Sequence, residues 1–293
     1  MNRIIISGAG GFLGYRIIDK ALEEGISVIA ISSGKKRRSD VEYVNTDAFL
    51  ESGYQCSSED IFINCLFPTN ADGYKMADGL HKVYRIIDRA HESGVGAFIN
   101  ISSQSVYASR RTAPAKEEQQ LSLETPYAVG KYSSEEMVNR IFSDRPHTNI
   151  RMASLLGVGY DQRILNRMVI QALKGEQLKV VGGMQQYGFL DVRDAAAGLI
   201  KLAKSDPEMW KEEYNLGRNE SYTLIDVVEC IVTQVKQKAG MDVAYTVTEG
   251  QDNRNSSIDA SVFMRSFDWK PEITLSETTA DIIRSIQCRQ NNV

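Results

Sequence analysis

The stretch Ile4-Ile5-Ile6-Ser7-Gly8-Ala9-Gly10-Gly11-Phe12-Leu13-Gly14, near the start of the sequence, decides the fold. The three isoleucines predict a short strand that is buried on both faces, as in a parallel sheet covered by helices. The glycines predict a tight turn, and apolar residues then recur from Leu13 to Ala21 at helical spacing. Gly25 ends this helix, and an apolar strand at 28–31 completes a strand–helix–strand unit.

The glycine turn has the spacing that a dinucleotide requires. Gly8, Gly11 and Gly14 form a Gly-x-x-Gly-x-x-Gly pattern between the strand and the helix. One glycine permits an unusual backbone conformation, a second lets the backbone approach a pyrophosphate, and a third lets the helix pack close to the strand. The free N–H groups of the helix start then face the phosphates. Glycine clusters are common in plain turns, but this context favours a dinucleotide at Gly8, Gly11, Phe12, Leu13 and Gly14.

The following residues continue the alternation of strands and helices. Further strands are expected near 41–47, 61–67, 97–101 and 149–156, with helices around 83–90 and 127–142. This order predicts an α/β fold with a parallel sheet covered by helices. The segment 108–126 carries two prolines and several Glu and Gln residues, and it is expected to be a surface loop.

The pattern loosens after Gly157. Helices are expected at 162–174, 192–203, 224–235 and 275–286, with a short strand at 178–181. We therefore expect a dinucleotide-binding domain over residues 1–156 and a smaller, mixed α/β lobe over 157–293. The helix near 192–203 is expected to return to the first domain.

Composition excludes several classes of function. The chain has 293 residues and a formal net charge of −4, which gives no electrostatic reason to expect nucleic acid. No run of about 18 apolar residues predicts a membrane span, and we expect no secretory signal, because no long apolar segment is followed by a small-residue cleavage site. The four cysteines show no CxxC, and the three histidines make no metal-ligand spacing with them. We expect no metal site, reduced cysteines of which several are buried, and a cytoplasmic protein.

The end of the second strand bears on the choice of cofactor. An acidic residue that binds the adenosine ribose is usual there, but Ser32 and Ser33 occupy the position, followed by the cations 35–38, which begin with Lys35. No carboxylate would repel a 2′-phosphate, so NADP(H) is favoured and NAD(H) is the alternative. The same residues could also form an ordinary solvated basic loop.

Tyr127 and Lys131 are candidates for the chemistry. They are four residues apart, so they lie on one face of the predicted helix. A phenol has a pKa near 10, and a cation beside it would bring that pKa closer to neutral pH. Tyr127 could then take a proton from a hydroxyl or give one to a carbonyl while hydride passes to or from a nicotinamide. A Tyr-x-x-x-Lys pair is common by chance, and on its own it would be taken for an ordinary surface pair, but the upstream glycine turn makes it more specific.

The chain resembles the extended short-chain dehydrogenases/reductases of the NAD-dependent epimerase/dehydratase family, whose best-known members modify nucleotide sugars. The motifs that carry the resemblance are Gly8-x-x-Gly11-x-x-Gly14, Asp47, Ser102-Ser103-Gln104-Ser105-Val106-Tyr107, Pro126-Tyr127-x-x-x-Lys131, Arg151 with Gly157, Leu190-Asp191-Val192-x-Asp194, Tyr214-Asn215-Leu216-Gly217 and Trp269-Lys270-Pro271. They extend over nearly the whole chain. The resemblance implies a Rossmann-type, doubly wound parallel sheet and a smaller C-terminal lobe, over residues 157–293, that mainly binds substrate.

The resemblance implies roles for single residues. Ser103 would be the catalytic hydroxyl that binds the reacting oxygen, and Tyr127 would be the acid/base. Lys131 would hold the nicotinamide ribose and tune Tyr127. Asp47 would contact adenine, and Arg254 would bind the nucleotide diphosphate. By analogy, the helices around 83–91 and 127–142 would pair two copies into a homodimer.

The chain also departs from the family pattern. The usual asparagine before the helix at 83–91 is missing, with Gly79 or a neighbour in its place, and prolines common after Arg151 and Gly157 are absent. Gln104 and Ser105 replace the Asp-Glu pair of the dehydratases, and neither can act as a carboxyl acid.

We expect an NAD(P)-dependent enzyme acting on a nucleotide-linked sugar, as an epimerase or a 4-keto-reductase and not as a 4,6-dehydratase. A reductase of a non-nucleotide carbonyl compound is one alternative. A dinucleotide-binding protein without catalysis is another.

Overall fold

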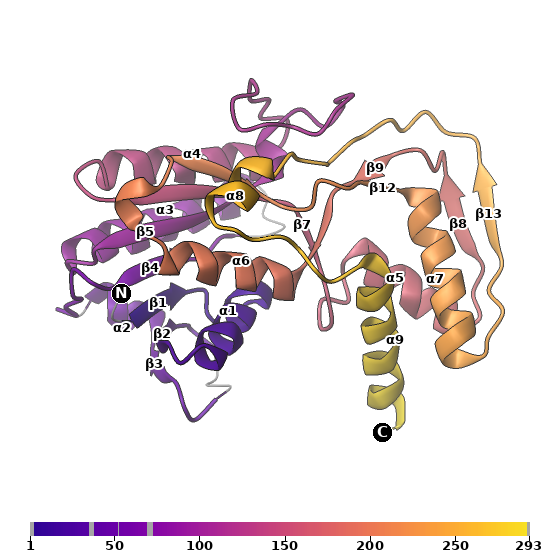
Figure 1. The fold of residues 1–293 in the computed structure, drawn as a ribbon, viewed down its shortest axis with the longest axis horizontal. Coiled ribbons are helices and arrows are strands. Elements are labelled where there is room, and N and C mark those ends of the chain that lie inside the picture. Colours follow the sequence, from indigo (N-terminus) through magenta and orange to yellow (C-terminus); the bar gives the residue numbers. More distant parts are fainter. Residues whose placement is uncertain (1–2, 35–37, 52, 69–72, 292–293) are drawn as a thin grey trace.

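A computed structural model describes residues 3–34, 38–51, 53–68 and 73–291 (Figure 1). Its main sheet contains seven strands, all parallel to their neighbours. In spatial order they are β11 (Glu213–Leu216), β6 (His147–Met152), β5 (Ala97–Ser103), β4 (Ile61–Asn64), β1 (Arg3–Ser7), β2 (Ser27–Ile31) and β3 (Glu42–Val44). This is the doubly wound, Rossmann-type order that the sequence predicts.

The central position of β1 follows from its residues. Ile4, Ile5 and Ile6 are fully buried, and β1 pairs with β2 on one edge and with β4 on the other. The chain winds outward from β1 through β2 and β3, and then returns to continue through β4. This reversal creates a crevice at the carboxyl ends of β1 and β4, where open α/β sheets bind their ligands.

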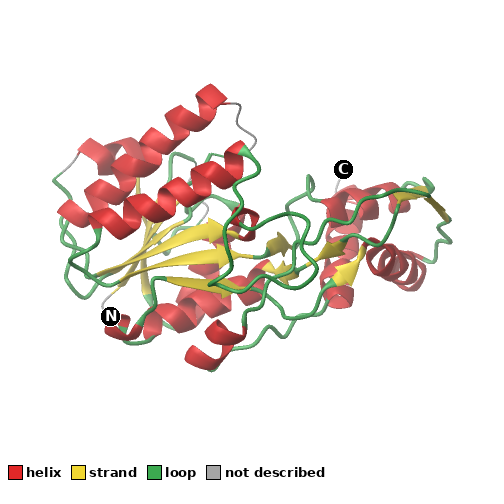
Figure 2. Cartoon of the chain, turned by 90° about the horizontal axis from the view of Figure 1, so that it is seen from above, coloured by secondary structure: helices red, strands yellow, loops and turns green. Residues whose placement is uncertain are grey.

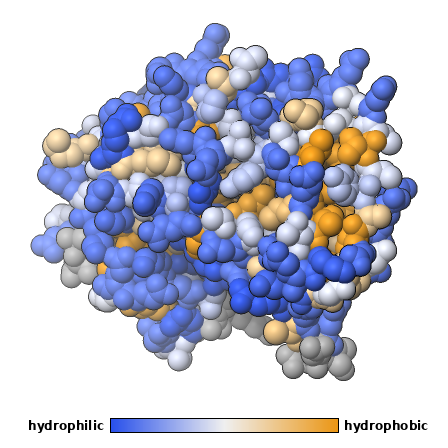
Figure 3. All heavy atoms as spheres, turned by 45° about the vertical axis from the view of Figure 1, so that its right-hand side comes forward, coloured by the Kyte–Doolittle hydropathy of each residue, from blue (hydrophilic) through white to orange (hydrophobic). Residues whose placement is uncertain are grey.

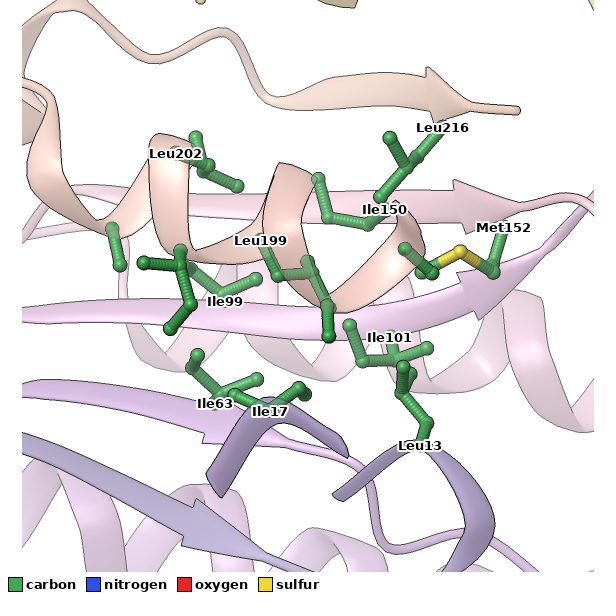
Figure 4. Packing of buried hydrophobic residues seen from close by; sticks show 14 of the residues in the cluster. Leu13, Ile17, Ile63, Ile99, Ile101, Ile150, Met152, Leu199, Leu202 and Leu216 are labelled. Carbon is green, nitrogen blue, oxygen red and sulfur yellow. The ribbon is translucent and has the colours of Figure 1, made fainter. Parts of the chain in front are cut away.

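Helices cover both faces of the sheet, which Figure 2 shows from above. On one face α1 (Phe12–Glu23) packs against α6 (Val192–Lys204), and on the other α3 (Gly73–Glu92) packs against α4 (Pro126–Ile141). The core between the sheet and the pair α1 and α6 is drawn in Figure 4. There Leu13 and Ile17 of α1 face the aliphatic side chains of β4, β5 and β6. A second core under α3 and α4 contains Phe62, Phe98 and Phe142.

Short elements complete the part of the chain around the main sheet. They are α2 (Thr46–Glu51), α8 (Ser261–Ser266) and the 3-10 turns η1 (Gln104–Val106) and η2 (Pro207–Met209). The turn η1 directly follows β5, at the edge where the crevice opens.

A separate apolar cluster forms among three helices, α5 (Ile164–Leu173), α7 (Leu224–Ala239) and α9 (Leu275–Asn291), on the right of Figure 1. Small two-stranded sheets border it, formed by β8 (Leu178–Val181) with β13 (Tyr245–Thr248), β9 (Gln186–Tyr187) with β12 (Tyr222–Thr223), and β7 (Ser154–Leu156) with β10 (Phe189–Asp191). The division into residues 1–156 and 157–293 remains our proposal. The separate apolar cluster supports a second lobe, but β11, α6 and α8, which lie beyond residue 156, pack with the main sheet.

Two expected strands end earlier than their apolar residues suggest. The expected strand at 149–156 divides into β6 and β7, because Ala153 N–H bonds the carbonyl of Leu216 and β7 then pairs with β10 instead of the main sheet. The strand expected to run to 67 ends at Asn64. Its side-chain oxygen accepts hydrogen bonds from Ser7 Oγ at 2.6 Å and Leu66 N–H at 3.2 Å, which turns the chain out of the sheet.

The expectation of a surface loop at 108–126 is wrong for part of this segment. Residues 108–122, here called the strap, include Arg111 at 8% exposure and Ala115 at 0%. Ala115 N–H bonds the carbonyl of Ser257 at 3.1 Å, and Ala115 forms a bridge with Ile258. The strap is therefore anchored to a segment more than a hundred residues away, and the local sequence gives no sign of this partner.

The cysteines are less buried than expected. Cys56, Cys65 and Cys230 are partly buried, Cys288 is exposed, and all four are free thiols. Among the described residues, no helix is both long and apolar enough to cross a bilayer. Hydrophilic residues cover most of the face drawn in Figure 3, and hydrophobic residues show mainly across its middle and on its right-hand side.

Candidate active site

The glycine turn has the backbone conformation and the crowding that its spacing predicts. Gly8 has φ +68°, in the left-handed region that favours glycine. A Cβ on Gly14 would lie 2.5 Å from the carbonyl oxygen of Gly8, so only glycine lets α1 pack this close to the end of β1. A Cβ on Gly8 would lie 2.8 Å from the backbone of Cys65 and Leu66. The backbone packs closely around this turn and requires glycine at both positions.

The start of α1 fits a pyrophosphate. Gly11 is its N-cap residue and has no side chain to bond the free N–H groups, and the first turn contains no acidic residue. These N–H groups and the positive end of the helix dipole therefore remain available to an anion. Gly11, Phe12, Leu13 and Gly14 also line the main cavity. The residues present thus fit the phosphates of a dinucleotide.

This cavity, of about 610 Å³, brings the predicted groups together. Ser103, Tyr127 and Lys131 line it beside Gly8 and the start of α1. The three side chains come from different elements: Ser103 ends β5, and the other two lie on the first turns of α4. The cavity also lies at the carboxyl ends of β1, β4 and β5, the position that the sheet topology favours for a ligand.

Local interactions fix the start of α4. Thr125 is its N-cap, and its hydroxyl accepts the Ala128 N–H at 3.1 Å, while Pro126 occupies the first turn. Tyr127 and Lys131 consequently share one face, as their spacing predicts.

Lys131 is fully enclosed and donates from Nζ to the carbonyl of Ile101 at 2.7 Å. Nζ also lies 3.8 Å from the centroid of the Phe67 ring. Burial lowers the pKa of Lys131 to about 7, although Cys65 and Glu135 oppose this shift. Lys131 is therefore close to the balance between its charged and neutral forms.

The expected effect of Lys131 on Tyr127 is not found. Burial raises the pKa of Tyr127, and only partial opposition comes from the Ser103 hydroxyl and from the charge of Arg163. Lys131 Nζ lies 5.8 Å from the Tyr127 ring centroid, donates to the Ile101 carbonyl and lies closer to the Phe67 ring. Tyr127 is therefore a protonated phenol at neutral pH.

A buried polar network supports the end of β5. Ser102 Oγ donates to the Glu135 carboxylate, and Arg151 Nη2 binds the same carboxylate at 2.9 Å. Arg151 also donates to the hydroxyl of Tyr107, which in turn donates to Asn215 at 2.9 Å. This network ties β5, β6, α4 and β11 together directly beneath Ser103. Ser102, Tyr107, Arg151 and Asn215 belong to the motifs noted in the sequence, whereas Glu135 does not, and the pairing of these residues becomes visible only in three dimensions.

The residues predicted to bind the adenosine end of the dinucleotide are not among the described residues that line the cavity. Ser32 Oγ packs against Gly10 and accepts the Gly34 N–H at 3.1 Å, and Ser33 is exposed. Lys35 falls outside the described residues. Arg38 is described, and its guanidinium already binds Asp19 and Asp40, both at 2.8 Å. The cation closest to the predicted 2′-phosphate site in the described part of this loop is therefore partly neutralised.

Asp47 and Arg254 also lie apart from the described lining of the cavity. Asp47 lies in the first turn of α2, is mostly exposed and pairs with Lys82 at 3.1 Å. Arg254 is exposed in the loop before α8 and pairs with Asp252. Their roles toward adenine and diphosphate stay predictions.

Residues that the sequence did not single out close the far side of the cavity. Tyr160 lies 4.8 Å from Phe12, centroid to centroid, and Arg163 lies over the Tyr160 ring at 4.8 Å. Tyr160, Gln162 and Arg163 all line the cavity. The one sequence signal that could have identified them is their position between the end of β7 and the start of α5, since loops at this edge of such sheets carry ligand contacts.

A Rossmann sheet, a glycine turn without a capping side chain and a Ser/Tyr/Lys group in one cavity define a dinucleotide-dependent enzyme of the short-chain dehydrogenase type. The model of the NAD dependent epimerase/dehydratase family matches residues 4–217, and the chain belongs to this family.

Similar proteins of known activity extend over nearly the whole chain. The UDP-glucuronic acid decarboxylase 1 of Danio rerio is 24% identical, over 99% of this chain and 75% of that protein. The dTDP-4-dehydro-6-deoxyglucose reductase of Escherichia coli is 21% identical, over 98% of both chains.

Solved structures share the fold. A UDP-N-acetylglucosamine 4-epimerase from Bacillus cereus superposes with a TM-score of 0.83 at 20% identity, over 98% of this chain and 97% of that chain. A UDP-glucuronic acid 4-epimerase from Bacillus cereus, solved with UDP-glucuronic acid and NAD, gives a TM-score of 0.81 at 17% identity, over 98% and 99%.

Proposed function

We propose that this enzyme catalyses hydride transfer at a carbon of a nucleotide-linked sugar, as a 4-keto-reductase or an epimerase. The observation that carries the proposal is the convergence of Ser103, Tyr127 and Lys131 on one cavity with the glycine turn. The relatives named above act on nucleotide-linked sugars, which supports the substrate class.

The cofactor fits the cradle formed by Gly8, Gly11 and the start of α1. A nicotinamide dinucleotide bound there would supply or accept the hydride. We propose that Lys131 holds the nicotinamide ribose from the buried end of the cavity.

Tyr127 would transfer the proton, and Ser103 would stabilise the reacting oxygen. In the reducing direction, the Tyr127 hydroxyl gives its proton to the carbonyl oxygen of the sugar as hydride reaches the carbonyl carbon, so that a hydroxyl forms. Ser103 Oγ donates a hydrogen bond to the same oxygen and steadies it as negative charge develops. The raised pKa of Tyr127 keeps the phenol protonated at neutral pH, which suits this direction. An epimerase would run the step in both directions on opposite faces of one sugar carbon.

A 4,6-dehydratase is disfavoured. Gln104 and Ser105 line the cavity where a dehydratase needs carboxyl groups to move a proton and expel water, and neither side chain can do this near neutral pH.

We also propose that NADP(H) is preferred over NAD(H), because Ser32 and Ser33 present hydroxyls and no carboxylate at the end of β2. The pairing of Arg38 with Asp19 and Asp40 weakens the support from the basic loop. Fluorescence titration with NADPH and NADH tests this, and we expect the lower Kd for NADPH. Equal affinities, or a lower Kd for NADH, would overturn the preference without touching the rest of the proposal.

Nucleoside diphosphates test the substrate class. A ligand that binds only the folded state raises the melting temperature. We expect at least one of UDP, GDP, CDP and TDP to do so at saturation. No shift with any of them would favour the alternative reductase of a non-nucleotide carbonyl compound. Binding of a dinucleotide by the wild type without turnover of any carbonyl or sugar substrate would instead favour the non-catalytic alternative.

A further inference from the structure

The chain that leaves β4 is tightly packed against two helices at the edge where the cavity opens. Pro68 packs on α3, because a Cβ on Gly79 of that helix would lie 2.4 Å from the proline ring. Phe67 packs on α4, because a Cβ on Gly130 would lie 3.1 Å from Cζ of the Phe67 ring. Glycine inside a helix is unfavourable. The space that Phe67 and Pro68 need explains why both helices carry one here.

The ring of Phe67 contacts two side chains of the candidate active site. Lys131 Nζ lies 3.8 Å from its centroid, and the Tyr127 ring stands at 85° to it with 5.4 Å between the centroids. Tyr127, Gly130 and Lys131 lie on one face of α4, since they are three and four residues apart. The ring of Phe67 therefore rests on this face at the residue that has no side chain. Phe67 is partly exposed and lines the cavity.

The surroundings of Lys131 make the face of this ring important. Burial opposes the charged form of Lys131, so an ammonium there depends on the few groups that it touches. The Ile101 carbonyl accepts one N–H of Nζ at 2.7 Å, and the Phe67 ring lies at another side of the same nitrogen. An aromatic face attracts an ammonium, and the attraction is stronger where water is excluded. The carbonyl and the ring together hold the ammonium and leave its remaining donors to a ligand.

We propose that Phe67 is a positioning residue for Lys131: the face of its ring holds the ammonium at the cavity, where the ammonium binds the nicotinamide ribose. The perpendicular contact with Tyr127 and the close fit at Gly130 fix the ring in this place. A leucine would fill much of the same space but could not attract an ammonium. The inference rests on the proposed function and deepens it, because it assigns the placement of Lys131 to a side chain that takes no part in the chemistry.

The first test is a double-variant cycle measured as dinucleotide affinity of the full-length protein. Fluorescence titration with NADPH and with NADH gives Kd for the wild type, Phe67→Leu, Lys131→Met and the double variant. We expect Phe67→Leu to raise Kd by about 5-fold or more in the wild-type background. In the Lys131→Met background the same change should alter Kd by less than about 2-fold, because no ammonium is left for the ring to hold.

The pH dependence of the same Kd is the second test. The ribose contact uses the charged ammonium, so dinucleotide affinity should fall as pH rises through the pKa of Lys131. The ring stabilises the charged form, and in Phe67→Leu the fall should therefore begin about half a pH unit lower. Cys65 and Glu135 also act on the charge of Lys131, and Tyr127 faces the same ring. All three are unchanged in this variant.

Phe267→Leu is the matched control. Phe267 is also a partly buried phenylalanine, it packs on Phe263, and it is not among the described lining residues. The control should lose stability in urea denaturation and keep the wild-type Kd. Should Phe67→Leu not fold, replacement of Phe67 by 3,5-difluorophenylalanine keeps the ring and weakens the negative charge of its face. We expect this replacement to raise Kd by about 2-fold or more.

Three results would overturn the role of Phe67 and leave the proposed function intact. They are wild-type affinity in Phe67→Leu or with the fluorinated ring, an equal rise of Kd with and without the Lys131 ammonium, and an unchanged pH profile. A wild type that binds a dinucleotide but transfers no hydride to or from any nucleotide sugar would overturn the proposed function, while the cycle would still decide whether Phe67 positions Lys131. No binding of either dinucleotide would overturn both.

Discussion

At the residue scale, the site depends on how burial changes two titrating side chains. Tyr127 has a raised pKa and Lys131 a lowered one, because each loses water at the buried end of the cavity. The spacing of the two residues predicted that they share a helix face, but it could not predict the charge state of either. That depends on Phe67, Ile101 and Arg163, which come from other elements.

Replacement of Tyr127 by Phe tests the acid/base role. The variant keeps the ring that packs on Phe67 but loses the hydroxyl, so we expect turnover to fall by about 100-fold or more while dinucleotide affinity stays within a few-fold. Steady-state kinetics and fluorescence titration measure the two quantities. An unchanged rate would remove Tyr127 from the chemistry.

Lys131 predicts a pH dependence of stability. Its pKa is about 7 in the folded protein and about 10.4 in an unfolded chain, so the unfolded state binds more protons between these values. The free energy of unfolding of the cofactor-free protein should therefore rise from pH 7 to pH 10, with this residue contributing up to about 1.4 kcal/mol per pH unit. Urea denaturation at several pH values measures this slope.

The matched variant for that slope is Lys131→Met. It removes the titrating group and keeps an unbranched apolar stem, so the difference in slope between wild type and variant isolates Lys131. If the two proteins show identical slopes, Lys131 does not have a lowered pKa in the folded protein, and the prediction is wrong.

At the element scale, hydrophobic periodicity predicted the main strands and helices because each of them is buried over several residues. It did not predict β7, β9, β12 and β13, which have two to four residues and exist through pairing with distant segments. The hydrogen-bonded row of Asn64, Asn100 and Asn149 could not be predicted from periodicity either. Their side chains bond one another across β4, β5 and β6, and only the register of the sheet aligns them.

The sequence pattern alone was sufficient to predict the glycine turn. Gly14→Ala should place a methyl group against the Gly8 carbonyl and push α1 from β1, at a cost of about 1–3 kcal/mol in stability and with loss of dinucleotide binding. Gly53→Ala is the control, because no atom lies within 4 Å of a Cβ there. Denaturation and titration with the preferred dinucleotide test both variants. Wild-type affinity in Gly14→Ala would contradict the close packing of this turn.

The network beneath Ser103 gives a second test at this scale. Glu135 and Arg151 are almost completely buried, so Arg151→Met leaves a buried carboxylate unpaired and should cost about 3–5 kcal/mol. The double variant Arg151→Met/Glu135→Gln removes both charges and should recover most of that loss. Urea denaturation compares the two. A single variant as stable as the wild type would show that the pair does not hold β5, β6 and α4 together.

At the scale of the whole molecule, the cavity lies where two independently built parts meet: the parallel sheet with its glycine turn, and the segment from Gly157 to α5 that carries Tyr160 and Arg163. The family motifs predicted the first part because they are local. They did not predict the second, since its loop takes its position from the packing of Tyr160 on Phe12. The buried strap is a further case, because its partner lies near Ile258.

The outer surface of α3 and α4 supports the proposed homodimer. The two helices pack side by side, and Tyr84 and Val129 stay exposed at 41% and 46%. We expect light scattering to give twice the monomer mass, and Tyr84→Glu with Val129→Glu to give the monomer. A monomer at every concentration of the wild type would contradict this pairing.

The central claim is that hydride moves between a nicotinamide and a carbon of a nucleotide-linked sugar in the cavity of Ser103, Tyr127 and Lys131. Its most direct measurement is a single-turnover reaction of the dinucleotide-bound protein with a panel of nucleotide sugars and their 4-keto forms, followed by nicotinamide absorbance. We predict a change in nicotinamide redox state with at least one sugar, and none with the same sugar in Tyr127→Phe. No change with any sugar of the panel, or an equal change in Tyr127→Phe, would contradict the claim.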